Sequence, residues 1–273
     1  MKKIFLVLVI AASAAVLPSC KKTDSIKGCI NKDALNYNSN ATEDDGSCVA
    51  PLQVHKTVLF DFTGTQCGSC SSVGIPTFMQ AIVDNPRTLV PFSVHCGSGD
   101  PINNNTSLQF SNDPFYAVSG TPTFAVGNTA GVGINASAVN TAIAANTSSA
   151  ADAGLAATTT VIGNVANITA RVKFFNAVSG EYWLGMYILE NGVISPQISL
   201  PDPYSHYHVL RACANQTGGI RGQKIANGAV AAGTIIDQSV SYTMSNVNDP
   251  SKIVVSLILW KNTSGTWTMV NAW

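Results

Sequence analysis

Two cysteines separated by two residues, Cys67 and Cys70, stand between two short apolar runs and constrain the fold more than any other feature. The first run, residues 57–62, and the second, residues 88–95, both have the length and character of buried strands. Residues 71–83 between them can form a helix that is interrupted near Pro76. A strand, a helix and a second strand at this spacing predict a βαβ unit, whose two strands are parallel neighbours.

The cysteine pair is predicted to lie at the start of that helix. The positive end of a helix dipole stabilises a thiolate, and so lowers the pKa of a cysteine placed there. Cys67 is the more exposed of the two in such a turn, so we expect it to attack and Cys70 to resolve the intermediate. The alternative is a permanent Cys67–Cys70 disulfide that only pins the helix.

Two further cysteines lie outside this motif. Cys96 ends the second predicted strand, and the carboxyl ends of parallel strands meet at one edge, so His95 and Cys96 are expected near the pair. Cys213 is far away along the chain. A Cys96–Cys213 disulfide could tie two domains together, and two free thiols are an equal alternative.

The first residues have the layout of an export signal. Lys2 and Lys3 precede an apolar run at residues 4–17, which is shorter than the roughly 20 residues that a membrane-spanning helix needs. Ser19 followed by Cys20 resembles the lipobox of bacterial lipoproteins. We therefore expect residues 1–19 to be removed, Cys20 to carry lipid, and the protein to be held on the outer membrane, on a face that the sequence leaves open.

The charge content excludes one class of partner. Charged residues make up 11% of the chain, against about 25% in an average domain, and the formal net charge is +0. No basic patch or phosphate-binding loop is present, so we expect no nucleic-acid partner and no cofactor.

Residues 20–51 form a predicted tether and a small polar module. In an oxidising compartment, the two cysteines that bracket the module, Cys29 and Cys48, are expected to form a structural disulfide. Asp33, Asp44 and Asp45 offer hard oxygen ligands to calcium, but their spacing does not match an EF-hand loop. A plain spacer is the favoured interpretation.

The pattern changes along the chain. Residues 52–150 read as the α/β part, with a further strand at 123–126 and an alanine-rich helix at 136–145. Residues 151–273 read as a second, all-β domain. Its predicted strands, separated by turn signals that favour an antiparallel sandwich, cover residues 157–162, 166–175, 182–189, 234–243, 253–260 and 266–270.

The α/β part resembles thioredoxin-like proteins. Asp61 lies six residues before Cys67, where thioredoxins place a buried carboxylate, and Pro122 lies in a segment that resembles their cis-proline loop. The resemblance implies that Asp61 handles the proton of the second cysteine and that Pro122 packs against the pair and binds extended substrate. Gln66 and Ser69 replace the tryptophan and proline of thioredoxins, which leaves the redox potential and the partner surface open.

Most of the chain from residue 57 to 273 resembles the outer membrane protein family named for its twenty-eight-kilodalton founder. The resemblance rests on the lipobox, on residues 61–65 and on residues 208–211. It implies a bacterial lipoprotein with a thioredoxin-like domain followed by an antiparallel immunoglobulin-like β-sandwich.

Two functions follow as expectations. The first is a thiol–disulfide oxidoreductase that acts on the thiols or disulfides of exported proteins. The second is a non-enzymatic lipoprotein that binds an unknown surface ligand, or serves in adhesion, with Cys67–Cys70 as a structural disulfide. His206, His208 and Asp202 form a weak metal pattern, because two histidines without a firm third ligand are usually ordinary loop residues.

Overall fold

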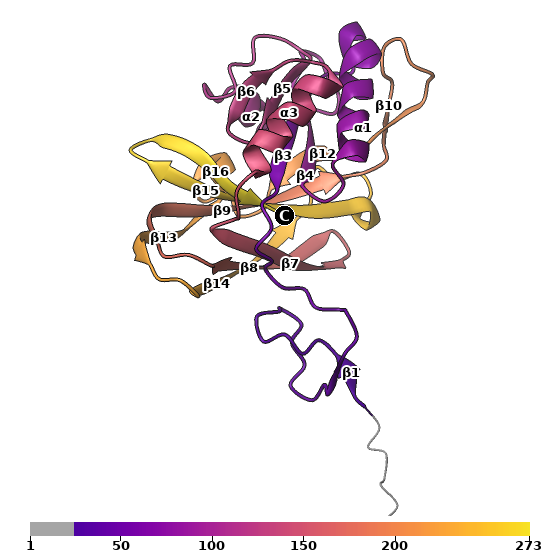
Figure 1. Ribbon diagram of the computed structural model, residues 1–273. Coiled ribbons are helices and arrows are strands. Elements are labelled where there is room, and N and C mark those ends of the chain that lie inside the picture. Colours follow the sequence, from indigo (N-terminus) through magenta and orange to yellow (C-terminus); the bar gives the residue numbers. More distant parts are fainter. Residues whose placement is uncertain (1–24) are drawn as a thin grey trace, which may run out of the picture.

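The computed structural model describes residues 25–273, so the predicted signal peptide and Cys20 lie outside the described residues. Its largest element is a nine-stranded sheet in the order β16-β15-β9-β12-β4-β3-β5-β6, with β13 paired to β9 (Figure 1). Along the chain, its strands are β3 (Thr57–Thr63), β4 (Leu89–His95), β5 (Thr123–Val126), β6 (Thr129–Val132), β9 (Val178–Glu190), β12 (Val209–Cys213), β13 (Gln223–Val230), β15 (Ile253–Thr263) and β16 (Thr266–Ala272).

The predicted βαβ unit is present. Strands β3 and β4 are parallel neighbours, and the helix between them begins with a π-helical turn, η1 (Cys70–Gly74), that continues into α1 (Ile75–Asp84). Pro76 stands in the first turn of α1 and does not interrupt it. A first-turn proline is tolerated because the N–H that it lacks would have no partner within the helix.

Successive side chains of β3 point into two different hydrophobic cores, one on each face of the sheet. Leu59 contributes to the core beneath α1 and α3 (Ala136–Thr147), whereas Phe60 and Phe62 enter an aromatic core on the opposite face with Phe110 of α2 (Asn105–Ser111). Because successive side chains of a strand point to opposite faces, Asp61 shares the face of Leu59. The carboxylate is therefore directed to the side of the sheet that α1 covers.

A second β layer completes the other half of the molecule. It is an antiparallel sheet of β7 (Ala153–Ile162), β8 (Val165–Phe174) and β14 (Ile235–Thr243). Its inner face packs on β9 and β15 through a core that includes Leu155, Phe174, Leu184 and Leu257. The protein is thus mostly β, with several sheets and few helices among the described residues.

One strand joins the two halves. Strand β12 pairs antiparallel with β9 on one side and parallel with β4 on the other, so the large sheet runs across the boundary predicted between residues 150 and 151. Its Arg211 forms an ion pair of 3.1 Å with Glu190, and both side chains are buried. Most of segment 208–211 therefore lies in the strand that holds the halves together.

The N-terminal module, residues 25–49, lies at one end of the molecule beyond β7 and β8 (Figure 1). It contains the predicted Cys29–Cys48 disulfide and two short parallel strands, β1 (Lys27–Gly28) and β2 (Glu43–Asp44). Arg171 of β8 donates to the main-chain carbonyls of residues 33 and 34. These contacts dock the module on the outer face of the three-stranded sheet.

The three carboxylates considered for calcium have other roles. Asp33 pairs with Lys173, while Asp44 and Asp45 accept N–H groups of their own turn, from Gly46 and Ser47. Within residues 25–273, no group of three or more acidic, histidine or cysteine side chains is arranged to hold a metal ion. No helix of that same range is long and apolar enough to span a membrane.

Candidate functional site

The loops after β3 and β4 meet at two glycines. A Cβ atom built on Gly64 would lie 3.2 Å from the Cα of Gly97, a contact tighter than most side chains make. This close approach brings the cysteine pair next to the segment that follows His95, as parallel strands require.

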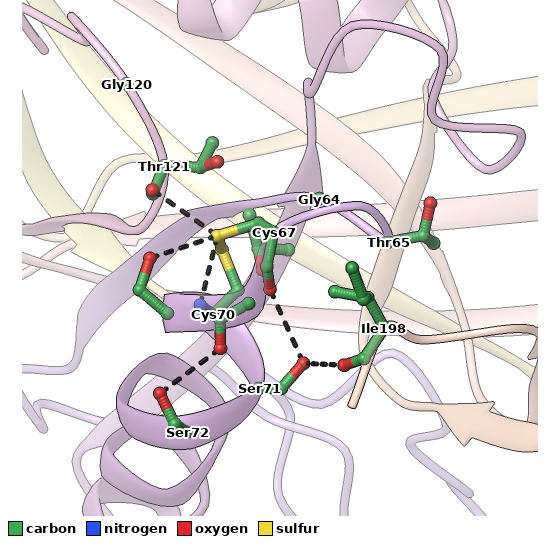
Figure 2. Close-up of a disulfide and its surroundings, with 12 residues drawn as sticks. Gly64, Thr65, Cys67, Cys70, Ser71, Ser72, Gly120, Thr121 and Ile198 are labelled. Carbon is green, nitrogen blue, oxygen red and sulfur yellow. Dashed lines mark hydrogen bonds between the residues drawn. A yellow bond between two sulfur atoms is a disulfide. The ribbon is translucent and has the colours of Figure 1, made fainter. Parts of the chain in front are cut away.

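Cys67 and Cys70 form a disulfide at the start of the helix, with their Cα atoms 5.1 Å apart (Figure 2). Cys70 is fully buried, whereas Cys67 is partly exposed. The main-chain N–H of Cys70 donates to Cys67 Sγ at 3.0 Å, and the Ser69 hydroxyl lies 3.4 Å from the same sulfur. Both donors would stabilise negative charge on Cys67 when it is a thiolate.

The predicted proline loop faces the pair. The Thr121–Pro122 peptide bond is cis, and the carbonyl oxygen of Thr121 lies 3.3 Å from Cys67 Sγ (Figure 2). Pro122 packs on the helix at Gly74, where an added Cβ would come within 3.1 Å of the proline ring. Glycine at this position lets the loop approach the sulfurs closely.

A cleft of about 320 Å³ opens beside Cys67, and a second cleft of similar volume adjoins it on the side of Cys96. The two clefts share Gly97, Ser98 and Thr121. Their lining, as far as residues 25–273 describe it, contains no charged side chain. Such a surface offers hydrogen bonds without selecting for charge.

Asp61 is buried, and burial raises the pKa of its carboxyl from 3.8 to about 8. Its Oδ1 atom has no hydrogen-bond partner among the described residues. A carboxyl group in this state is neutral and can hold a proton near physiological pH.

The second half of the chain reaches over the cysteine pair, which the sequence did not indicate. Between β10 (Val193–Ser195) and β11 (Tyr204–His206), Gln197 donates to the main-chain carbonyls of Gly64 and Cys67, at 3.3 and 3.4 Å, and to the Ser71 hydroxyl at 2.9 Å. Ser71 in turn donates to the Ile198 carbonyl (Figure 2). These partners are more than 120 residues apart, so no local pattern could have revealed them.

His95 also belongs to the site. Its Nδ1 lies 2.7 Å from Asp100 Oδ2, and both side chains are buried. Burial acts to raise the pKa of Asp100, but the hydrogen bond and charge of His95, with N–H groups of Thr65 and Ile102, outweigh it and lower that pKa. Asp100 is therefore an ionised acceptor that fixes the His95 ring.

The two histidines of the weak metal pattern, His206 and His208, do not form a metal site within residues 25–273. The His206 ring lies 5.0 Å from that of His95, and burial lowers the pKa of His206 to about 4. The His208 ring lies 6.2 Å from Phe78, and its pKa is also lowered by burial. The two histidines thus contact different groups.

Cys96 and Cys213 are free, so the predicted alternative of a disulfide between them is wrong. Strand pairing through β12 ties the halves together in its place. Burial raises the pKa of Cys96 to about 11 and that of Cys213 to about 12, so both are protonated thiols at neutral pH.

Comparisons with known proteins agree with this architecture. The sequence profile of the family described as outer membrane protein Omp28 matches residues 110–270. HBP35 of Porphyromonas gingivalis is similar in structure, with a TM-score of 0.66 and 19% identity over 82% of this chain and 75% of that chain. The curli protein CsgC of E. coli is 13% identical over 44% of this chain and 97% of its own, but its TM-score of 0.22 is too low to inform the fold. No curated protein matches the sequence.

Proposed function

The chain belongs to the Omp28 outer membrane protein family, which assigns it to the cell envelope, and from that premise we propose that it is a thiol–disulfide oxidoreductase. In this proposal, lipid on Cys20 holds the protein on the outer membrane, and the substrates are thiols or disulfides of exported proteins. No cofactor is needed, because both redox atoms are cysteine sulfurs.

The environment of Cys67 carries the proposal. Its sulfur is partly exposed at a helix start, accepts the N–H of Cys70, and faces the carbonyl of Thr121 before a cis-proline. Reactive cysteines occupy such partly exposed, donor-rich positions, whereas structural disulfides are usually sealed. The π-helical turn η1 is consistent with this, because such turns are frequent at functional sites.

The chemistry balances within the pair and its substrate. A substrate thiolate attacks Cys67 Sγ, the disulfide breaks, and Cys70 leaves and takes up a proton. A second substrate thiolate then attacks its own sulfur in the mixed disulfide and releases Cys67 as a thiolate. The substrate loses two electrons and gains a disulfide, and the cysteine pair is reduced. The same steps in reverse reduce a substrate disulfide.

We further propose that residues 52–150 are thioredoxin-like and that residues 151–273 are an immunoglobulin-like sandwich joined to them by β12. The βαβ unit, the facing cis-proline and the two packed β layers support this assignment. Asp61 would then take the role of the buried carboxylate that exchanges a proton with Cys70.

The lining of the two clefts supports a polypeptide substrate. Glycine and neutral polar side chains surround Cys67. An extended chain could hydrogen-bond there through its backbone, and its side-chain charges would matter little. Exchange rates should therefore depend weakly on ionic strength.

Trapping tests the proposal. Cys70→Ala should accumulate mixed disulfides between Cys67 and exported proteins, because the resolving thiol is missing, and Cys67→Ala should trap none. The wild-type protein should also catalyse insulin reduction by dithiothreitol. If Cys70→Ala captures nothing and Cys67 stays inert, the oxidoreductase proposal fails and a surface-binding lipoprotein with a structural disulfide is the better account.

A further inference from the structure

A pocket of about 390 Å³ lies where the segment from the N-terminal module enters the body of the protein, beside the carboxyl end of the chain (Figure 1). Apolar side chains make up most of its wall. They are Leu52 and Val54 of the entering segment, Pro86 between α1 and β4, Leu155 of β7, and Trp273 after β16. None of the residues that line this pocket lines the clefts beside the cysteine pair. It is therefore a separate site, and mostly apolar pockets of roughly this size are typical of small-molecule binding.

A buried asparagine holds the entering segment in place. The Asn271 side chain donates to the main-chain carbonyls of Val54 and of the first residue of β7, at 3.0 and 2.7 Å. It also accepts the main-chain N–H of Lys56 at 2.8 Å. Gly154 allows the close approach of this segment to β7, since an added Cβ would collide with the carbonyl oxygen of Leu52. The pocket wall is therefore fixed by specific contacts.

Two cations, Lys56 and Arg87, line the same pocket, and no acidic side chain of the described residues does. Within residues 25–273, neither cationic group forms an ion pair, a hydrogen bond or a cation–π contact. By contrast, ion pairs engage Arg171, Lys173, Arg211, Arg221, Lys224 and Lys252. Lys56 is half-buried, and this burial lowers the pKa of its ammonium group. An anion bound beside Lys56 would offset that loss of solvation.

The volume of the pocket limits the size of the ligand. An apolar cavity of about 150 Å³ holds benzene, so a pocket of about 390 Å³ has room for one saturated chain of about 12–16 carbons and not for two. Leu52 is 64% exposed and Val54 is 43% exposed. A chain bound along them would remove apolar surface from water, which favours binding.

We propose that this pocket binds a fatty-acid anion, with the acyl chain along the apolar wall and the carboxylate paired with Lys56 and Arg87. Burial of the chain supplies most of the affinity, and the two cations select a negative head group. A single-chain ligand fits the volume, whereas a membrane phospholipid carries two chains. The site does not involve the cysteine sulfurs, so binding is independent of the proposed thiol–disulfide exchange.

Calorimetric titration of the oxidised protein with monomeric saturated fatty acids tests the proposal. The affinity should rise about fourfold for each added CH₂ group and then level off at about 12–16 carbons, when the pocket is full. Acetate, which lacks the chain, and dodecyltrimethylammonium, which reverses the charge, should not bind measurably. An affinity that keeps rising well beyond that length, or equal binding of the ammonium compound, would mean non-specific adsorption and would overturn the proposal.

Two matched double variants test the role of the cations. Lys56→Gln combined with Arg87→Gln should weaken dodecanoate binding by about tenfold, since it removes both partners of the carboxylate. Lys27→Gln combined with Lys32→Gln removes the same charge from exposed lysines of the N-terminal module and should leave the affinity unchanged. Equal affinities in the two double variants would overturn the pairing of the carboxylate with Lys56 and Arg87.

Tryptophan fluorescence locates the ligand. Dodecanoate should change the emission of the wild type, and Trp273→Phe should lose that change, because Trp273 is the tryptophan that lines the pocket within the described residues. A change that persists in Trp273→Phe would place the ligand elsewhere and overturn the proposal. Binding to phosphatidylglycerol vesicles without any binding of dodecanoate would also overturn it, since a bilayer surface would then be the ligand.

Discussion

Replacing the buried carboxyl by a neutral amide, Asp61→Asn, should stabilise the protein at pH 8 and change it much less at pH 5. The carboxyl is fully buried, and burial raises its pKa from 3.8 to about 8. Each pH unit between these two values lowers the free energy of unfolding by about 1.4 kcal/mol, so the full penalty approaches about 6 kcal/mol as an upper bound.

The direction follows from which state binds the proton. Below pH 3.8 the carboxyl is protonated in both the folded and the unfolded chain, so its raised pKa does not lower the free energy of unfolding. Between pH 3.8 and about 8 the unfolded chain ionises while the folded one does not, so stability falls as the pH rises. Above that range both states are ionised and the penalty is complete.

Denaturant unfolding of the oxidised protein at pH 5 and pH 8 measures this. Relative to the wild type, Asp61→Asn should raise the free energy of unfolding by about 4 kcal/mol more at pH 8 than at pH 5. Asp237→Asn is a matched control of opposite sign, because hydrogen bonds from Arg171 lower the pKa of Asp237. In Asp237→Asn the free energy of unfolding should fall by at most about 1 kcal/mol at pH 8, and by less at low pH. An Asp61→Asn effect that is equal at both pH values would refute a buried, neutral carboxyl.

Three further outcomes are expected. Gln197→Ala removes the hydrogen bonds that this side chain donates to three acceptors around η1, so it should lower the free energy of unfolding by about 1–3 kcal/mol. It should also speed alkylation of reduced Cys67, which mass spectrometry can follow, and unchanged alkylation would contradict the role of this side chain. In the folded, reduced protein at pH 8, iodoacetamide should modify Cys67 well before Cys96 or Cys213, whose pKa values burial raises, and early labelling of Cys213 would contradict its burial. Arg171→Ala should expose the N-terminal module to proteolysis while the melting temperature of the body changes little, whereas a large fall would show that the module is part of the core.

Local sequence signals predicted the part of the site that is local in the chain. The apolar run at residues 57–62, the cysteine spacing and the strand that ends at His95 placed Cys67 and Cys70 at a helix start, where the structure has them. The resemblance to thioredoxins added Asp61 and Pro122, and the structure shows a buried carboxyl and a cis bond at these positions.

The contacts that cross between the two halves could not be predicted. Strand β12 is short and lies outside the strands that the sequence predicts, so neither its burial nor its pairing with β4 has a periodic signature. The contacts of Gln197 with the cysteine turn depend on that pairing, because it places the β10–β11 segment over η1. The position of His206 beside His95 has the same origin.

Two local misreadings have simple physical causes. Pro76 was read as a break, but a proline in the first helical turn has no hydrogen bond to lose. The polar residues 97–118 give no helix signal, although Asn104 and Ser107 cap α2 reciprocally and Phe110 anchors that helix in the aromatic core.

The reduction potential of the Cys67–Cys70 pair tests the account most directly. Equilibrating the protein with dithiothreitol or glutathione redox buffers and quantifying free Cys67 gives this value. An exchanging pair should have a potential between about −270 and −120 mV, the range of known oxidoreductases. A potential below about −300 mV, typical of structural disulfides, would contradict the central claim.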